Sequence, residues 1–300
     1  MQQHISLTAA DGYQLAATVS TPERPALASD GRAAWIVIGS ATAVPRGFYA
    51  KFAQYAASCG LHVIATDYRG CGGSKPASLR GFDMQYADWS RLDLAAAIDY
   101  AQARGPVWLV GHSLAGHALG QLPDPGKLQA AIVCAAGAGW HGHMPALEAA
   151  KAWAMWHLLG PVTTRIWGYH PMSKFGMGED LPMGVYRDWK RWCQFPSYSF
   201  DDPAAAHITQ GFDRVTLPLA TVNTTDDWWA LPSSRNAFFK HFKSTRFEPM
   251  DFAPAQLGVQ AVGHMGYFRA NVGRVLWPRM LTWLEGHGLP TLPIQTVQPH

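Results

Sequence analysis

Runs of consecutive apolar residues alternate with amphipathic segments through the first half of the chain. The apolar runs occupy residues 35–38, 61–65, 107–110 and 128–134. Strands that are buried on both faces of a parallel sheet have this continuous apolar pattern. Between the runs, the pattern predicts helices over 48–58, over 86–103 and from Ser113 onward. This alternation of strand and helix predicts an α/β fold with a mostly parallel, doubly wound sheet.

The segment before the first apolar run has a different pattern. Residues 5–7 and 13–19 alternate between apolar and polar side chains, and the turn-forming pair Asp11-Gly12 lies between them. Alternation with a period of two, interrupted by an Asp-Gly pair, is typical of a β-hairpin. We therefore expect the chain to open with a hairpin.

The alternation of strand and helix breaks between residues 138 and 212, where Gly, Pro and aromatic residues are frequent. It resumes with the apolar run 217–222, a helix after Pro232, a strand-like segment ending at Val262 and a closing helix over 272–285. We expect a single α/β core built from residues 1–137 and 213–288. Residues 138–212 form an inserted helical lid in this interpretation, and 289–300 a loosely ordered tail.

Composition and charge favour a compact protein that acts on a small, neutral molecule. Hydrophobic residues make up 48% of the chain and charged residues only 15%, below the roughly 25% charged residues of an ordinary domain. The net charge of +3 is spread without any basic run, which argues against nucleic acid as a partner. No apolar stretch approaches the length of a membrane span, and the first residues lack the pattern of a signal peptide. We therefore expect a cytoplasmic protein with no membrane partner.

Residues 111–115 (GHSLA) follow an apolar strand and open a helix, the setting of a nucleophile elbow. In such an elbow the serine backbone is strained, and the residues two before and two after the serine come close to neighbouring chain. Gly111 and Ala115 are small enough for this. Ser113 is therefore the candidate nucleophile, with the role of an ordinary helix N-cap as the alternative.

A serine needs a base to become a good nucleophile, and in this fold the order along the chain is Ser, then Asp or Glu, then His. His264 lies between two glycines on a loop before the final helix, which suits a catalytic imidazole. For the acid that orients this imidazole, Asp227 precedes Pro232 by the favoured spacing. The adjacent Asp226 stays open as an alternative acid.

Two backbone N–H groups must stabilise the oxyanion that forms when the serine attacks a carbonyl. The residue after the nucleophile, Leu114, supplies one in this motif. The loop after the strand at 35–38 consists of small residues and must supply the other, and we favour Ala41.

Several segments together resemble a known family. Residues 67–74 (DYRGCGGS) are similar to the D-x-R-G-x-G-x-S loop of the α/β-hydrolase superfamily, ahead of the elbow at 111–116 (GHSLAG). The segments at 168–171 (GYHP), 178–182 (GEDLP), 191–193 (RWC) and 263–269 (GHMGYFR) resemble a bacterial subgroup of predicted α/β hydrolases, often labelled serine aminopeptidase-like. This resemblance runs from about residue 5 to 285 and implies a triad of Ser113, Asp227 and His264. The chain departs from the pattern at Gly39-Ser40, where His-Gly is common, and at Ala115, where glycine is common.

These features together predict a serine hydrolase that works through an acyl-enzyme, most readily on a carboxylester of a small, fairly apolar substrate. Such a reaction calls for no cofactor and no metal. The aromatic and methionine residues of the lid and of the His264 loop are candidates for substrate contacts or for packing: Trp153, Trp156, Trp167, Met155, Met172 and Met265. Two alternatives stay open, an acyltransferase that uses the same triad and a non-catalytic protein that binds a small molecule.

Overall fold

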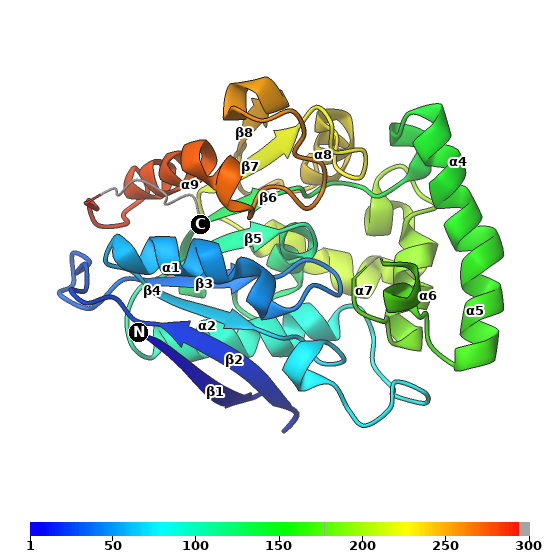
Figure 1. The fold of residues 1–300 in the computed structure, drawn as a ribbon, viewed down its shortest axis with the longest axis horizontal. Helices are drawn as coiled ribbons and strands as arrows, with labels where there is room; N and C mark the ends of the chain where they lie inside the picture. Colours follow the sequence, from blue (N-terminus) through cyan, green and yellow to red (C-terminus); the bar gives the residue numbers. More distant parts are fainter. Residues whose placement is uncertain (177, 294–300) are drawn as a thin grey trace.

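The computed structural model describes residues 1–176 and 178–293 and contains a mixed sheet with helices on both faces (Figure 1). The strands are β1 (Gln2–Thr8), β2 (Gln14–Ser20), β3 (Trp35–Gly39), β4 (His62–Thr66), β5 (Val107–His112), β6 (Leu128–Cys134), β7 (Leu219–Thr224) and β8 (Phe247–Phe252). The helices are α1 (Ala50–Ser58), α2 (Ala95–Gln102), α3 (Leu114–Ala118), α4 (Ala146–Ala154), α5 (Gly160–Trp167), α6 (Met183–Trp192), α7 (Ala206–Thr209), α8 (Pro232–Phe239) and α9 (Ala270–Glu285).

The order of strands in the sheet is β1-β2-β4-β3-β5-β6-β7-β8. β1 pairs with β2 and β2 pairs with β4 in antiparallel fashion, and the remaining neighbours are parallel. The central strands β3, β5 and β7 are buried along their whole length, as the continuous apolar runs predicted. The opening hairpin and the mostly parallel, doubly wound α/β sheet are confirmed.

Two apolar layers hold the helices against the sheet. On one face, side chains of α1 and α9 form a core with the sheet, and on the other face side chains of α2, α3 and α8 do so. Because β3, β5, β6 and β7 all run in the same direction, the loops that follow them lie at one edge of the sheet. This is the edge at which chemistry is expected in an open α/β sheet.

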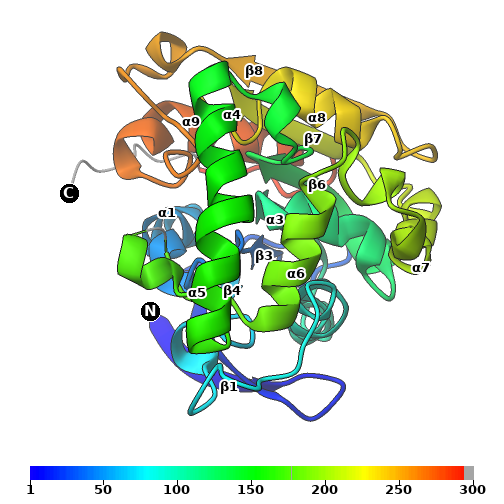
Figure 2. The same cartoon turned by 90° about the vertical axis from the view of Figure 1, so that its right-hand side faces the viewer.

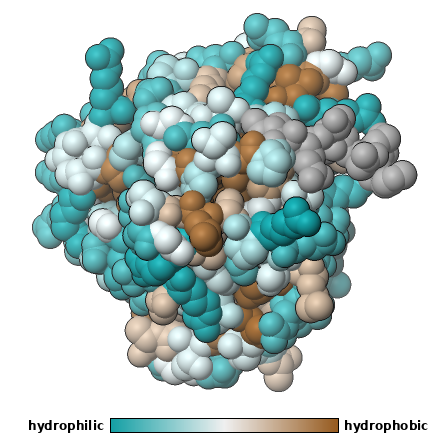
Figure 3. Space-filling model, turned by 90° about the vertical axis from the view of Figure 1, so that its left-hand side faces the viewer, coloured by the Kyte–Doolittle hydropathy of each residue, from teal (hydrophilic) through white to brown (hydrophobic). Residues whose placement is uncertain are grey.

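Residues 138–212, hereafter the insert, lie between β6 and β7 and contain α4 to α7. Helical structure is continuous from α4 through a π-helical turn at Met155–Leu159 into α5. The resulting long helix lies at one end of the molecule and crosses in front of the sheet in Figure 2. The opposite end of the molecule presents a mostly polar surface (Figure 3).

The last strand and the tail differ from the sequence-based expectation. β8 ends at Phe252, ten residues before Val262, and residues 258–269 form a loop. The prediction of a strand ending at Val262 is wrong, because its apolar residues pack as a loop against the core. Leu289 and Leu292 are buried, so the first part of the predicted loose tail is packed, and residues 294–300 lie outside the described residues. No helix within the described ranges is long and apolar enough to cross a membrane.

Candidate active site

Ser113 lies between the end of β5 and the start of α3 with a backbone conformation that non-glycine residues rarely adopt. Its φ is 51° and its ψ is −102°. The N–H of Ser113 donates to the carbonyl of Cys134 at 2.8 Å, and its carbonyl accepts from the N–H of Gly116 at 2.9 Å. These two bonds hold the strained turn in place, and such strain persists only where neighbouring structure enforces it.

The turn at Ser113 requires glycine at the two positions that pack against Ala115. A Cβ atom at Gly111 would lie 2.7 Å from the Cβ of Ala115, and a Cβ atom at Gly39 would lie 2.6 Å from it. Both distances are shorter than real carbon contacts. The methyl group of Ala115, which departs from the glycine common in this motif, therefore fits because Gly39 and Gly111 both lack a side chain.

Ser113, His264 and Asp227 form a continuous hydrogen-bonded chain. Nε2 of His264 lies 3.0 Å from Oγ of Ser113. Nδ1 of His264 lies 2.9 Å and 3.1 Å from the two carboxylate oxygens of Asp227. A carboxylate only accepts, so the proton of a neutral His264 is on Nδ1, and Nε2 is free to accept the proton of the serine hydroxyl.

Asp227 is fully buried, and two further donors fix its carboxylate. The N–H of Trp229 donates to Oδ1 at 3.1 Å, and the hydroxyl of Tyr267 donates to Oδ2 at 3.2 Å. Burial and the nearby negative charge of Asp227 hold the pKa of Tyr267 well above its usual value, so its hydroxyl keeps the proton that it donates. Sequence reasoning assigned no role to Tyr267, although it lies three residues after His264.

The alternative acid, Asp226, has a different position. Its Oδ2 accepts from the N–H groups of Val262 and Gly263 at 2.7 Å and 3.1 Å. These bonds anchor the start of the loop that carries His264, and no contact between Asp226 and the imidazole is found. The geometry thus separates two neighbouring carboxylates that the sequence left open: Asp227 contacts the imidazole, and Asp226 holds its loop.

His112, the residue before the nucleophile, ties this loop to the loop after β3. It is fully buried, and burial lowers its pKa to about 3, so the ring is neutral. Its Nε2 lies 2.8 Å from the carbonyl of His264, and its Nδ1 lies 3.0 Å from the hydroxyl of Tyr49. Because a carbonyl only accepts, Nε2 carries the proton, and Nδ1 accepts from Tyr49.

This chain of hydrogen bonds corrects the prediction for Ala41. The N–H of Ala41 donates to the hydroxyl oxygen of Tyr49 at 2.8 Å, so it is already engaged and buried. Thr42, one residue further, lines the cavity at Ser113. The loop stays the predicted source of the second donor, but its small residues, Gly39 to Ala43, gave no signal for which N–H faces the serine.

The backbone N–H groups of Thr42 and Leu114 are left as candidate donors to an oxyanion. Leu114 opens α3, where the first N–H groups of a helix have no intrahelical partner. Neither N–H has an intramolecular acceptor in the part of the chain that the structure describes. The side chain of Thr42 is held by the hydroxyl of Tyr86 at 3.1 Å.

The space beside Ser113 is small. A cavity of about 20 Å³ is lined by Ser113 and His264 together with side chains of the insert and of the loop after β7, among them Trp189 and Trp229. The rings of Trp189 and Trp229 lie 5.9 Å apart, centre to centre. A much larger cavity of about 740 Å³ lies under the long helix of the insert, and Trp229 lines this one as well.

The six residues expected to contact substrate lie in different places. Met155 lines the large cavity. The other five line neither cavity: Trp156 and Met172 are buried, Trp153 is exposed, and Trp167 and Met265 are half-buried. Trp156 packs with its ring centre 5.1 Å from that of Trp189 and so supports the wall of the small cavity from behind. The sequence showed that the insert is aromatic but not which side of each helix faces inward.

The polar residues of the 67–74 loop hold the loop rather than face Ser113. The carboxylate of Asp67 accepts from the N–H of Gly73 at 2.8 Å and from the N–H of Arg46 at 2.6 Å. Arg69 donates to the buried carboxylate of Asp93 at 2.8 Å. The polar side chains of this loop therefore maintain its conformation, and they contribute no reacting group at Ser113. Across residues 1–176 and 178–293, no group of three His, Cys, Asp or Glu side chains could hold a metal ion.

Known proteins are similar to this chain in sequence pattern and in structure. The sequence model of the alpha/beta hydrolase family matches residues 28–275, and a search of curated proteins finds no match. The esterase Pf2001 of Pyrococcus furiosus has a similar structure, with a TM-score of 0.58, 14% identity, and coverage of 96% of this chain and 93% of that chain. The alpha/beta hydrolase GrgF of Penicillium sp. sh18 has a TM-score of 0.62, 13% identity, and coverage of 96% and 99%. An esterase of Thermogutta terrifontis, described as malate bound, has a TM-score of 0.54, 15% identity, and coverage of 95% and 99%. At these identities the likeness establishes the fold.

Proposed function

Because this chain belongs to the alpha/beta hydrolase family, we propose that it is a serine hydrolase that cleaves carboxylesters through an acyl-enzyme. One observation carries the proposal: Ser113, His264 and Asp227 are joined by hydrogen bonds of 3.0 Å and 2.9 Å, with the serine in a strained turn at the end of a buried strand. This is the arrangement of nucleophile, base and orienting acid that acyl transfer requires. The esterases among the similar structures agree with this proposal.

The first half-reaction forms the acyl-enzyme. Nε2 of His264 takes the hydroxyl proton of Ser113 while Oγ bonds to the ester carbonyl carbon. The carbonyl oxygen becomes an oxyanion, and the N–H groups of Leu114 and Thr42 donate to it. The intermediate then collapses, the bond from carbon to the alcohol oxygen breaks, and His264 returns its proton to the leaving alcohol.

The second half-reaction uses water in the same way. His264 takes a proton from water, the resulting hydroxide attacks the acyl carbon, and Oγ of Ser113 leaves with the proton that His264 gives back. Asp227 stays ionised throughout and stabilises the imidazolium that forms in both steps. Ester cleavage is favoured over amide cleavage because an alcohol is a better leaving group than an amine.

Labelling with a fluorophosphonate probe tests the nucleophile. The wild-type protein should be labelled at one site and should hydrolyse nitrophenyl acetate, while Ser113→Ala should lose both properties and keep the same thermal unfolding temperature. Equal labelling of the two proteins would contradict the assignment of Ser113. Added alcohols test for acyl transfer: if most of the acyl group went to the alcohol instead of water, the protein would be a transferase with the same triad.

A further inference from the structure

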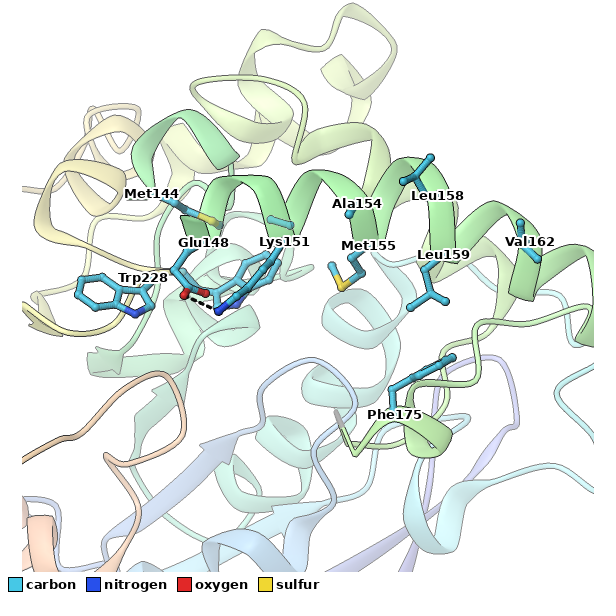
Figure 4. A pocket seen from close by; sticks show the side chains of 12 residues that line it. Met144, Glu148, Lys151, Ala154, Met155, Leu158, Leu159, Val162, Phe175 and Trp228 are labelled. Atoms are coloured by element: carbon cyan, nitrogen blue, oxygen red, sulfur yellow. Dashed lines mark hydrogen bonds and ion pairs between the residues drawn. The ribbon is translucent and has the colours of Figure 1, made fainter. Parts of the chain in front are cut away.

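An apolar groove runs beneath the long helix of the insert and shares one wall residue, Trp229, with the small cavity at Ser113. Its volume is about 740 Å³, within the range of sites that bind small molecules. Figure 4 shows Met155 and Leu159 directed from the helix toward Phe175, with Trp228 near the other end. The side chains that line the groove are mostly aliphatic, aromatic or thioether groups.

The groove offers almost no polar group to a ligand. Among the described residues that line it, the charged side chains are Glu148 and Lys151, and they pair with each other at 2.8 Å. This pair lies at the end of the groove near Trp228 (Figure 4). Recognition of a ligand along the remaining length therefore depends on burial of apolar surface.

The surface around the groove is also apolar. Among the described residues, the exposed large apolar side chains are Met1, Leu27, Leu147, Trp153, Leu158, Val162, Ile166, Phe175 and Trp228. All but the first two lie in the insert or line the groove. Exposed apolar side chains gathered in one place mark a binding site more often than scattered ones do.

The cavity at Ser113 is too small to hold a substrate by itself. Its 20 Å³ has room for about one water molecule, and Trp229 forms part of its wall as well as part of the groove wall. A substituent on the reacting carbonyl that is larger than a methyl group needs space beyond this cavity. The groove lies on the other side of the shared residue Trp229 and offers such space.

The shape of the groove selects a chain over a compact group. Its lining follows the insert helix from Glu148 to Val162, which is roughly 20 Å at a rise of 1.5 Å per residue. A site this long and this apolar suits an extended, unbranched alkyl chain. A compact ring system would fill only part of the length.

We propose that this groove binds a long, unbranched alkyl chain of the ester substrate, with Trp229 at the passage between the groove and Ser113. The proposal rests on the proposed ester hydrolysis. Each methylene group that enters the groove should raise kcat/KM roughly threefold to fourfold. From acetate to octanoate the increase should reach at least about 100-fold, even with part of the chain in contact with water.

Chain length is tested with soluble nitrophenyl esters of acetate, butyrate, octanoate and dodecanoate, below the concentrations at which they aggregate. In Leu159→Glu, the carboxylate enters the groove, and the ratio of octanoate to acetate hydrolysis should fall at least 10-fold. Leu159→Trp, which fills the groove without adding charge, should lower the same ratio. Ile166→Glu is the matched control, because Ile166 is 55% exposed on the same helix and does not line the groove.

A second series keeps the acyl group as acetate and lengthens the alcohol. If kcat/KM rises in the first series, the groove binds the acyl chain. If it rises in the second series, the groove binds the alcohol chain. A flat profile in both series would overturn the proposal. So would an Ile166→Glu variant as impaired as Leu159→Glu, because the apolar face would then serve a lipid surface or a second copy of the chain.

A binding measurement separates this proposal from that of ester hydrolysis. In Ser113→Ala, a methyl dodecanoate brominated near the chain end should quench tryptophan fluorescence, since Trp228 and Trp229 line the groove, and Leu159→Trp should weaken this binding at least 10-fold. Saturable quenching without any Ser113-dependent hydrolysis would keep the groove and reject the esterase. Hydrolysis of acetate esters without quenching would do the reverse.

Discussion

Replacement of Asp227 by Asn tests the central assignment of the site most directly. All the groups around this carboxylate are donors: Nδ1 of His264, the N–H of Trp229 and the hydroxyl of Tyr267. An amide of the same shape brings an NH₂ group against one of these donors in either orientation. It also removes the negative charge that would face the imidazolium formed during the reaction.

The expected size of the effect follows from burial and distance. A carboxylate and an imidazolium with charge centres about 4 Å apart interact by about 4 kcal/mol at an effective dielectric constant of about 20. Asp227 is fully buried, so water replaces little of this interaction, and about 4 kcal/mol corresponds to a rate factor of roughly 1,000. Control over the tautomer of His264 adds to it, and a loss of about 10,000-fold in kcat is typical of this substitution in a triad.

The neighbouring carboxylate provides the control. In Asp226→Asn, the amide oxygen can take the place of Oδ2 and keep both bonds to the N–H groups of Val262 and Gly263, since Oδ1 has no partner. We expect less than a 10-fold loss of kcat. Initial rates with nitrophenyl esters, together with thermal unfolding of each variant, measure both effects. A loss in Asp226→Asn that exceeds the loss in Asp227→Asn would refute the assignment of the acid.

Two further predictions concern the framework of the site. Gly39→Ala should lower the free energy of unfolding by about 1 to 3 kcal/mol, because its new Cβ would collide with the Cβ of Ala115. In urea unfolding, the double variant with Ala115→Gly should recover most of this loss. If the losses of the two single variants simply added in the double variant, the packing argument would be contradicted. Burial lowers the pKa of His112 to about 3, against about 6.5 in an unfolded chain. The unfolded state thus binds more protons as the pH falls, and between pH 7 and pH 5 the wild type should lose about 2 kcal/mol more stability than His112→Gln. Equal losses in urea unfolding would show that His112 is protonated in the folded protein.

Much of the fold could be predicted because buried parallel strands have a distinctive pattern. The apolar runs at β3, β4, β5, β6 and β7 cannot be confused with amphipathic helices of the same length. β8 was misplaced for a physical reason: it is an edge strand whose residues are all exposed or half-buried, so it lacks a continuous apolar run. The apolar residues near Val262 serve a loop, and an apolar run does not by itself distinguish a buried loop from a strand.

The site could be predicted as far as chain order determines it. Ser113 and His264 were proposed from their settings, and the spacing to Pro232 favoured Asp227 over the adjacent Asp226. Only the turn after β7 decides that the carboxylate of Asp227 faces His264 while that of Asp226 faces the N–H groups of its loop. The candidate oxyanion donor shifted from Ala41 to Thr42 for the same kind of reason, because side-chain hydroxyls compete for backbone N–H groups.

A buried relay of three hydrogen bonds through His112 connects two loops of the candidate site. Ala41 donates to Tyr49, Tyr49 donates to Nδ1 of His112, and Nε2 of His112 donates to the carbonyl of His264. The carbonyl of His264 can only accept, which fixes the donor and acceptor of each of the three hydrogen bonds. The relay therefore has a single arrangement of protons. The relay connects the loop that presents Thr42 to the loop that presents the proposed base, across the strand that ends at the proposed nucleophile. A shift of either loop would leave a buried donor or acceptor without a partner, at a cost of about 1 to 3 kcal/mol. The fold thereby holds the proposed base and the candidate oxyanion donor in fixed relative positions.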